Sequence, residues 1–508
     1  MSDPWALPDV DAAFFGDEWT AGAPGGVDDG RQPADDTEVD DTAADLADDD
    51  DDIEASLVDP PSDPMPNARR LVAERFHHDD TATLVNTGGA FYQWADSHWQ
   101  EIEAAALRAI FYERFEHAVY VKPGPTPKLV PFEPNRRKVA DLMEALQAVV
   151  QGPTRMDAPA WINDGFAPVA DIIPVGNGLL HLPTRVLHHH RPSFFNLHAV
   201  PFDHDPDAQE PVQWLQFLHD LWEDDGESID ALQELFGYVL SGDTSQQKMF
   251  LMVGPKRSGK GTIGRVLTHL IGPHNVAGNP MSSLGTNFGL QPLVDKPLLV
   301  MSDARMPRDN TVVGERLLSI SGEDMLTVDR KYRDHWTGKL PTRILILTNE
   351  LPNFDDSSGA LASRFVVLSL EKSWYGKEDP DLTAKLLTEL AGIFNWALEG
   401  LDRLHWRGRF VQPEAALEHI REMEQMASPT GAFVNDMCVV GPQHQITVDR
   451  LYSAYRRWCA YVGRDHIDSK AIFGRNLRAV VPTLRSTRPT DPSTGERYYA
   501  FQGITLSE

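Results

Sequence analysis

The stretch MFLMVGPKRSGKGTIGRVLTHLI, residues 249–271, decides the fold of the chain. Its first five residues form a continuous apolar run, as a buried strand does, and residues 263–271 repeat apolar side chains at helical spacing. Between them lies GPKRSGKGT at 254–262. A glycine-rich loop between a strand and a helix is the context that a phosphate-binding P-loop requires. A chance glycine-rich turn would not need these two neighbours, so the sequence predicts a P-loop.

The chemistry of the loop assigns roles to its residues. Its glycines let backbone N–H groups face phosphates, and the start of the helix adds positive potential. Lys260 is expected to reach the β- and γ-phosphates of ATP, and Thr262 to bind Mg²⁺, because Gly261 stands where a P-loop usually has Ser or Thr. The nucleotide-binding residues predicted here are Gly254, Pro255, Lys256, Arg257, Ser258, Gly259, Lys260, Gly261 and Thr262.

Three further apolar runs follow, LLVM, RILILT and FVVLSL, at 298–301, 343–348 and 365–370. Short apolar runs separated by helical or loop segments are typical of a buried parallel sheet in an α/β domain.

Polar residues follow two of these predicted strands and precede the third. Asp303 follows the first, where it would hold Mg²⁺ and polarise water, unless it is an ordinary strand-end cap. Asn349 follows the second and would orient the attacking water; its alternative role is a turn residue. Arg364 precedes the third, and in a ring ATPase such an arginine can reach the neighbouring subunit's nucleotide. With Lys260, these residues are the predicted catalytic set.

A basic and aromatic stretch lies between the strand before Asp303 and the strand before Asn349. It contains Arg330, Lys331, Tyr332, Arg333, His335 and Trp336. Contact with phosphates and stacking on bases require this mixture of side chains, so the stretch is a candidate DNA-binding hairpin. A solvated surface hairpin of the same composition is the alternative.

The charge of the chain is unevenly distributed. The formal net charge is −30 over 508 residues, but residues 1–64 alone hold 21 acidic residues against one basic residue, Arg31. Such a segment is predicted to be a disordered acidic tail, either solvating or directed at a basic partner. Residues 443–508 instead carry a net +4. The acidity of the whole therefore does not exclude nucleic-acid binding by the rest.

The cysteine content and the distribution of apolar residues limit the class of protein. Two cysteines cannot build a disulfide framework or a four-cysteine zinc site, which fits a reducing compartment. No apolar run approaches the roughly 18–20 residues that span a bilayer, and the first twenty residues do not read as a signal peptide. We expect a soluble protein of the bacterial host cytoplasm, without a membrane partner.

The order of these motifs resembles the superfamily 3 helicases, and within them the phage/plasmid primase-helicase family that includes the poxvirus primase-helicase. The resemblance covers roughly residues 90–410. It rests on GPKRSGKGT, LLVMSDAR, SGEDMLTVDRKY and TRILILTNELPNFDDSSGALASRF, and on the preceding NGLLHLPTRVL, PVQWLQFL and LQELFGYVLSGDTSQQK. In the family the acid of the second motif is often Glu, where this chain has Asp303. FGRNLRAVVP is similar to the winged-helix end of many members.

The resemblance implies an α/β fold with four parts: the acidic tail at 1–64, an N-terminal α+β family domain at 65–225, an AAA+-like ATPase domain at 226–410 and a winged-helix domain at 430–508. It implies hexameric rings that translocate on single-stranded or forked DNA, with Lys331, Arg333 and His335 lining the channel. The implied activity is that of an ATP-dependent helicase of phage, prophage or plasmid replication. Primer synthesis is expected from a separate primase, because the N-terminal part has no zinc-binding cysteine cluster and no obvious set of metal-binding carboxylates.

Two other functional classes fit part of the sequence. A nucleotide kinase is one, because GKGT also occurs in adenylate-kinase-like P-loops, although the loop here lies some 250 residues into the chain and no arginine-rich lid follows. The other is a DNA-binding loader with weak ATPase activity, which the single acid at 303 would allow. Stimulation of ATP hydrolysis by single-stranded DNA, phosphoryl transfer to a nucleoside monophosphate, or the absence of turnover distinguishes the three.

Overall fold

The structure of the chain is a computed structural model. It describes residues 56–78, 81–302, 311–331, 333–352, 354, 360–463, 467–490 and 495–507. Most of the predicted acidic tail, residues 1–55, and the predicted site residue Asp303 lie outside the described residues. Among the helices that the structure does describe, none is long and apolar enough to cross a membrane.

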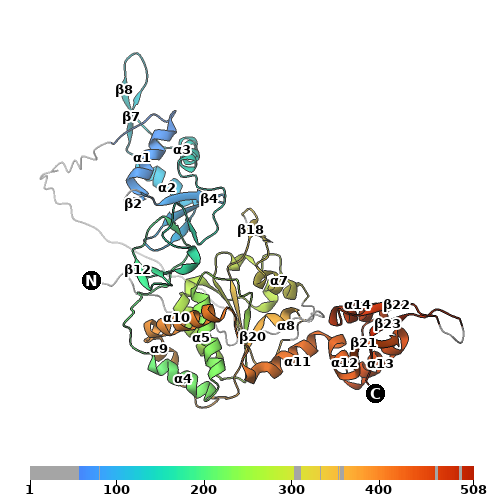
Figure 1. Cartoon of the computed structure of the whole chain (residues 1–508). Coiled ribbons are helices and arrows are strands. Elements are labelled where there is room, and N and C mark those ends of the chain that lie inside the picture. The colour runs from blue at the N-terminus through green and yellow to red at the C-terminus, as the bar shows by residue number, and fades with distance from the viewer. Residues whose placement is uncertain are drawn as a thin grey trace, which may run out of the picture. The chain divides into compact units, whose positions relative to one another are not determined.

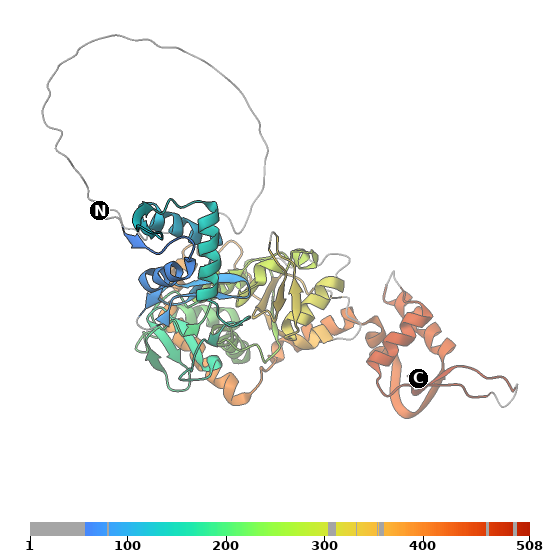
Figure 2. The same cartoon turned by 90° about the horizontal axis from the view of Figure 1, so that it is seen from above.

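The first folded region is α+β, as predicted (Figures 1 and 2). Three helices and the strand pair β7–β8 enclose a core that includes Phe76, Phe111 and Phe132. The antiparallel sheet β4-β5-β6 belongs to the same region of the sequence. The elements are β1 (Leu57–Val58), α1 (Pro64–Arg75), β2 (His77–His78), β3 (Thr81–Ala82), β4 (Leu84–Thr87), β5 (Ala90–Trp94), β6 (Trp99–Ile102), α2 (Ala104–Phe115), β7 (Val119–Lys122), β8 (Lys128–Pro131) and α3 (Arg136–Val149).

This region begins earlier than the sequence predicts. Strand β1 pairs in parallel with β7, and Val58 is buried in the core of the first region. The side chain of Asn67 accepts a hydrogen bond from the backbone N–H of Asp59 and donates one to its carbonyl. The end of the predicted tail, residues 56–64, is therefore part of the folded chain, because a short strand can join an existing sheet despite its acidic surroundings.

A second group of elements leads into the predicted ATPase domain. Strands β10 and β11 pack into the same hydrophobic core as helices α4, α5, α6 and α10. The predicted boundary between residues 225 and 226 thus falls inside one core. The elements are β9 (Ala160–Trp161), β10 (Ile172–Val175), β11 (Gly178–His181), β12 (Val186–His188), β13 (Phe194–Phe195), α4 (Val212–Trp222) and α5 (Gly226–Leu240).

A five-stranded parallel sheet in the order β15-β16-β19-β14-β20 forms the centre of the chain. Its strands read as continuous apolar runs because both faces are covered. Alternate side chains of β14, such as Phe250 and Leu251, belong to two different cores. One core contains α5 and α10 and the other contains α7 and α8, and Figure 1 shows these pairs on opposite sides of β20. The strands are β14 (Met249–Val253), β15 (Val276–Ala277), β16 (Leu298–Ser302), β19 (Arg343–Thr348) and β20 (Phe365–Ser369).

The remaining elements of this region cover or extend the sheet. A two-stranded hairpin, β17 with β18, occupies the predicted DNA-binding stretch. The elements are α6 (Lys260–Ile271), α7 (Thr311–Ser321), β17 (Leu326–Val328), β18 (Trp336–Gly338), α8 (Ala360–Arg364), α9 (Leu382–Leu387), α10 (Leu390–Arg407) and α11 (Leu417–Ala427).

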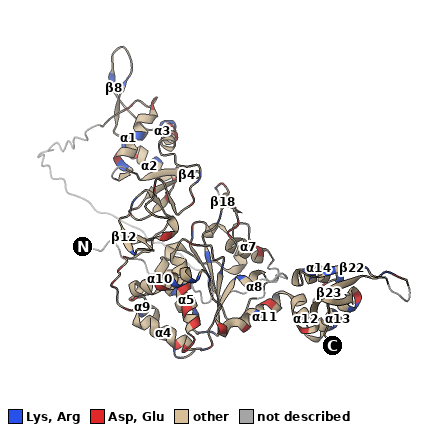
Figure 3. Cartoon of the chain, in the orientation of Figure 1, with Lys and Arg blue, Asp and Glu red and all other residues tan. Residues whose placement is uncertain are grey.

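The C-terminal region has its own core of buried residues, which includes Phe433, Tyr455 and Phe473. It consists of three helices and an antiparallel sheet in the order β21-β23-β22. Basic residues occur on α14 and β22 (Figure 3), in keeping with the positive charge of this part of the sequence. The elements are α12 (Pro429–Met437), β21 (Cys438–Thr447), α13 (Val448–Tyr461), α14 (Lys470–Val480), β22 (Arg485–Thr487) and β23 (Ala500–Leu506).

Candidate functional site

The glycine-rich loop lies between β14 and α6, as predicted. Gly259 precedes α6 with φ +91°, a left-handed conformation that favours glycine. A Cβ at this position would lie 3.0 Å from Leu221 and 3.2 Å from Phe217, so α4 supports the loop from behind. At the other end, a Cβ on Gly254 would lie 2.4 Å from the carbonyl oxygen of Leu370. Both glycines are therefore required by the shape of the loop.

The side chain of Lys260 folds over its own loop. Its ammonium group donates hydrogen bonds to the carbonyl oxygens of Gly254 and Pro255, at 2.8 and 2.7 Å, and to Oγ of Ser258 at 2.9 Å. Burial lowers the pKa of Lys260 to about 8. No carboxylate forms an ion pair with it among the described residues. A buried ammonium with only neutral partners favours an anionic ligand such as a phosphate.

Thr262 lies in the first turn of α6. Its Oγ1 accepts a hydrogen bond of 3.2 Å from Nη2 of Arg265, whose Nε donates to Thr383 in α9. A threonine hydroxyl is a hard oxygen ligand of the kind that Mg²⁺ prefers. The predicted second ligand, Asp303, directly follows β16 but lies outside the described residues, so the geometry of the pair stays a prediction.

The carboxyl ends of β14, β16 and β19 meet at one edge of the sheet. Val253 pairs with Thr348, and Ser302 pairs with Leu347. Asn349, which follows Thr348 and is exposed, therefore lies beside the start of the glycine-rich loop. The sheet brings Asn349 to the same edge as Lys260, as its predicted role requires.

Arg364 lies at the opposite edge. It ends α8 and precedes β20, whose first residue pairs with Met249 at the start of β14. Strand β14 has five residues, and a strand rises about 3.3 Å per residue. Arg364 is thus separated from the loop of its own chain by the length of the sheet.

The surroundings of Arg364 contain a second cation. Its Nη1 is buried without a hydrogen-bond partner among the described residues. Burial, and next the charge of Arg364, lower the pKa of nearby Lys248. The edge of the sheet opposite the glycine-rich loop thus holds two cations, Lys248 and Arg364.

The three predicted DNA-binding residues differ in their contacts. Lys331 is exposed, and its ammonium lies 5.5 Å from the ring centroid of Phe288, which is also exposed. Nη1 of Arg333 donates to both carboxylate oxygens of Glu101 in β6, at 2.7 and 2.9 Å. His335 lies 2.8 Å from Asp329. The hairpin is present, but two of the three side chains already contact carboxylates.

Sequence reasoning missed a loop that follows β20. Ser373 Oγ donates a hydrogen bond of 2.8 Å to the carbonyl of Lys256, and the N–H of Trp374 donates one of 2.9 Å to the carbonyl of Arg257. The next residue, Tyr375, is 80% exposed. The backbone of a segment that carries two aromatic residues thus lies beside the glycine-rich loop. Their sequence, SWYG, matches no motif, and only the pairing of β20 with β14 brings them here.

Comparison with known proteins concerns two segments of the sequence and the fold. Residues 69–223 match a family model described as "D5 N terminal like", and residues 252–364 match a "Family of unknown function (DUF5906)". The solved apo structure of the NrS-1 C terminal region (305-718) aligns with a TM-score of 0.50 at 12% identity, covering 87% of this chain and 99% of that chain. The A form apo structure of the same region gives 0.49 at 13% identity, covering 87% and 100%.

The two family matches and the aligned structure describe the chain at different levels. The first match ends at Glu223, directly after α4, and the second begins in β14 and ends at Arg364. At this identity the solved structure supports the fold alone. The chain therefore carries a region similar to the D5 N terminal like family, within a mixed α/β fold similar to that of the NrS-1 C terminal region.

Proposed function

We propose that the chain is an ATP-dependent DNA helicase of superfamily 3 that works in phage, prophage or plasmid replication. The observation that carries the proposal is the sheet itself, with Lys260 and Asn349 at one edge and Arg364 at the other. In a ring of identical subunits, such a sheet offers a nucleotide site on one side and an arginine for the next subunit's nucleotide on the other. A homo-hexamer is the assembly that the resemblance implies.

ATP and Mg²⁺ are the proposed cofactors. The glycine-rich loop would hold the phosphates through its N–H groups and Lys260, and Thr262 with Asp303 would hold the metal ion. When bound, Mg²⁺ neutralises charge that develops on the β- and γ-phosphates. Asn349 orients the attacking water, and Arg364 of the adjacent subunit stabilises the transition state. An AAA+-like ATPase domain is the corresponding fold.

The first test measures ATP hydrolysis by the full chain with and without single-stranded DNA, together with phosphoryl transfer to nucleoside monophosphates. A helicase should hydrolyse ATP faster with DNA and leave the monophosphate unchanged. Conversion of a monophosphate to a diphosphate would instead establish a nucleotide kinase. Absence of turnover under both conditions would favour a DNA-binding loader.

The C-terminal region contributes the second proposed DNA contact. The order of its elements, a helix, a strand, two helices and a strand pair, supports the proposed winged-helix domain, and α14 carries Arg475 and Arg478. The guanidinium of Arg488 lies 4.7 Å from the ring centroid of Tyr499, beside the exposed β22. Cationic and aromatic side chains together suit a nucleic-acid backbone. Primer synthesis is assigned to a separate primase.

Removal of Lys331 and Arg333, two cations of the β17–β18 hairpin, should abolish the stimulation of ATP hydrolysis by DNA. In the variant Lys331→Ala/Arg333→Ala we expect normal basal ATPase activity, without DNA stimulation or unwinding. Each lost phosphate contact should reduce the slope of log affinity against log salt by about 0.7 for a single strand. Fluorescence anisotropy with labelled single-stranded DNA at several salt concentrations measures this slope.

A matched control removes two cations from another hairpin. Lys122 and Lys128 are both exposed and face each other in the β7–β8 pair. The variant Lys122→Ala/Lys128→Ala changes the net charge equally and should unwind DNA normally. Equal salt slopes for the two double variants would show that the β17–β18 hairpin is a solvated surface element that does not contact DNA.

The aromatic pair beside the loop is proposed to stack on the base of ATP. Stacking on an aromatic ring is worth about 1–3 kcal/mol per base. Tyr375→Ala should therefore raise the KM for ATP on the order of tenfold, with little change in kcat. Steady-state kinetics measures both constants, and inhibition by inorganic tripolyphosphate, which has phosphates but no base, should stay unchanged.

Trp406→Ala serves as the control for this substitution, because Trp406 in α10 is 88% exposed. Its KM should equal that of the wild type. Weakened inhibition by tripolyphosphate in Tyr375→Ala would mean that the substitution disturbs the phosphate loop, and an unchanged KM would remove Tyr375 from the nucleotide site.

A further inference from the structure

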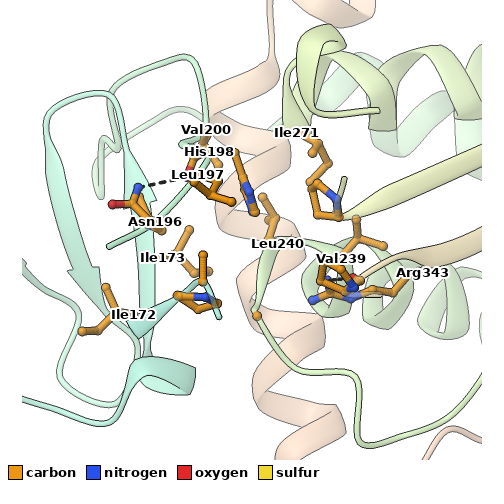
Figure 4. A pocket seen from close by; sticks show the side chains of 16 residues that line it. Ile172, Ile173, Asn196, Leu197, His198, Val200, Val239, Leu240, Ile271 and Arg343 are labelled. Carbon is orange, nitrogen blue, oxygen red and sulfur yellow. Dashed lines mark hydrogen bonds between the residues drawn. The ribbon is translucent and has the colours of Figure 1, made fainter. Parts of the chain in front are cut away.

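A cavity of about 50 Å³ lies where β10, the segment after β13, α5 and the start of β19 meet (Figure 4). Its walls are mainly apolar and include Ile173, Val200, Leu240 and Ile271. The volume exceeds what one water molecule needs. Arg343 begins β19 and Asn349 follows its end, so the cavity lies at the amino edge of the sheet, away from the glycine-rich loop.

Arg343 contributes a buried positive charge to this cavity. The residue is only 3% exposed. Its Nη1 donates to the carbonyl of Pro341 at 2.8 Å, and its Nη2 donates to the carbonyls of Tyr238 and Ser241. Nε has no hydrogen-bond partner, and no carboxylate oxygen lies within 4 Å of the guanidinium among the described residues. The charge is therefore stabilised by neutral carbonyls and by the ring of Tyr238, whose centroid lies 5.4 Å from Cζ, while Nε has no hydrogen-bond partner among the described residues.

His198 reaches the same cavity from another wall (Figure 4). Its Nδ1 is buried and likewise has no partner among the described residues. Burial, and next the charge of Arg343, lower the pKa of His198 to about 4, so the imidazole is neutral near pH 7. A neutral imidazole protonated at Nδ1 is a hydrogen-bond donor. Two unpartnered nitrogens, one on a cation, thus belong to residues that line one small cavity.

We propose that this cavity binds a small monovalent anion of the size of chloride, between Nε of Arg343 and Nδ1 of His198. A buried charge is stable when it is paired as well as hydrogen-bonded. Water in the cavity would satisfy the two nitrogens but would leave the guanidinium without a counter-charge in direct contact, because Asp243 acts on Arg343 without forming an ion pair with it among the described residues. The apolar walls and the small volume exclude nucleotides and larger organic anions. The site joins β10 and the segment after β13 to the central sheet.

Bromide is the direct probe of this site. Crystals of the full chain grown or soaked in sodium bromide should give an anomalous scattering peak within the cavity, at hydrogen-bond distance from Nε of Arg343 and Nδ1 of His198. Well-defined water at this position, without an anomalous peak, would overturn the proposal. This measurement uses the wild-type chain and does not depend on any variant that folds poorly.

Thermal unfolding gives a second readout. At equal ionic strength, the midpoint temperature of the first unfolding transition of the wild type should be about 2 °C higher in sodium chloride than in sodium gluconate. Chloride would bind the folded state and so stabilise it, whereas gluconate is too large for the cavity. Arg343→Met should remove this difference. Arg70→Met, which removes a partly exposed arginine paired with Asp59, should retain it. An equal response to chloride in Arg343→Met and the wild type would also overturn the proposal.

Discussion

Lys260→Ala should hydrolyse ATP at a background rate. The ammonium group of Lys260 is held by Gly254, Pro255 and Ser258 of its own loop, in the position where the β- and γ-phosphates are expected. Loss of one preorganised donor to a developing charge typically lowers kcat by about 10²–10³, and here the donor is also a cation. Phosphate release at saturating ATP measures the loss.

The same substitution should leave the fold intact, because the hydrogen bonds of Lys260 stay within its loop. Circular dichroism and thermal unfolding check this point. Lys385→Ala, which removes an exposed lysine paired with Asp379 in the neighbourhood of α9, should retain wild-type turnover. Normal turnover in a folded Lys260→Ala would mean that the loop does not bind the reacting phosphates.

Arg364→Ala tests the proposed ring. Since Arg364 lies at the edge of the sheet opposite its own glycine-rich loop, the substitution should leave ATP affinity unchanged. Hydrolysis should fall by a factor on the order of 10³ or more, as for other arginine fingers. Nucleotide binding followed with a fluorescent ATP analogue, and phosphate release under the same conditions, separate the two effects.

A mixture of the two inactive variants makes the test specific for an arginine that acts between subunits. An interface that joins the intact loop of an Arg364→Ala subunit to the intact arginine of a Lys260→Ala subunit should hydrolyse ATP. Activity should therefore appear at intermediate ratios and vanish at both extremes. Arg421→Ala, at an exposed position of α11, should be active at every ratio. Background activity throughout the mixing series would mean that Arg364 acts on the nucleotide of its own subunit or has only a structural role.

The part of the site that follows from strand order could be predicted from sequence. Apolar runs of four to six residues identify β14, β16, β19 and β20, and residues that follow parallel strands share one edge. Asn349 and the loop at 254–262 are therefore placed correctly relative to each other by sequence position alone. The same reasoning places Arg364 before a strand, and hence at the other edge.

Contacts between distant segments could not be predicted in this way. Glu101 and Arg333 are 232 positions apart in the sequence, and no sequence motif links the two residues. The predicted cationic stretch does form a hairpin, but amino-acid composition cannot show which of its cations is already paired with a carboxylate. Trp374 and Tyr375 were missed for a similar reason, because their place beside the loop depends on backbone hydrogen bonds to Lys256 and Arg257.

The ion pair between Arg333 and Glu101 has a consequence for energy coupling if the hairpin binds DNA. Nη1 alone makes both contacts with Glu101, so a phosphate that binds this nitrogen displaces the carboxylate, and β6 and the DNA strand compete for Nη1. By thermodynamic reciprocity, the contact with β6 weakens DNA binding by the same factor by which DNA weakens the contact with β6. Entry of a strand would then loosen the attachment of the N-terminal sheet, and the free energy of binding would be shared between holding DNA and releasing that sheet.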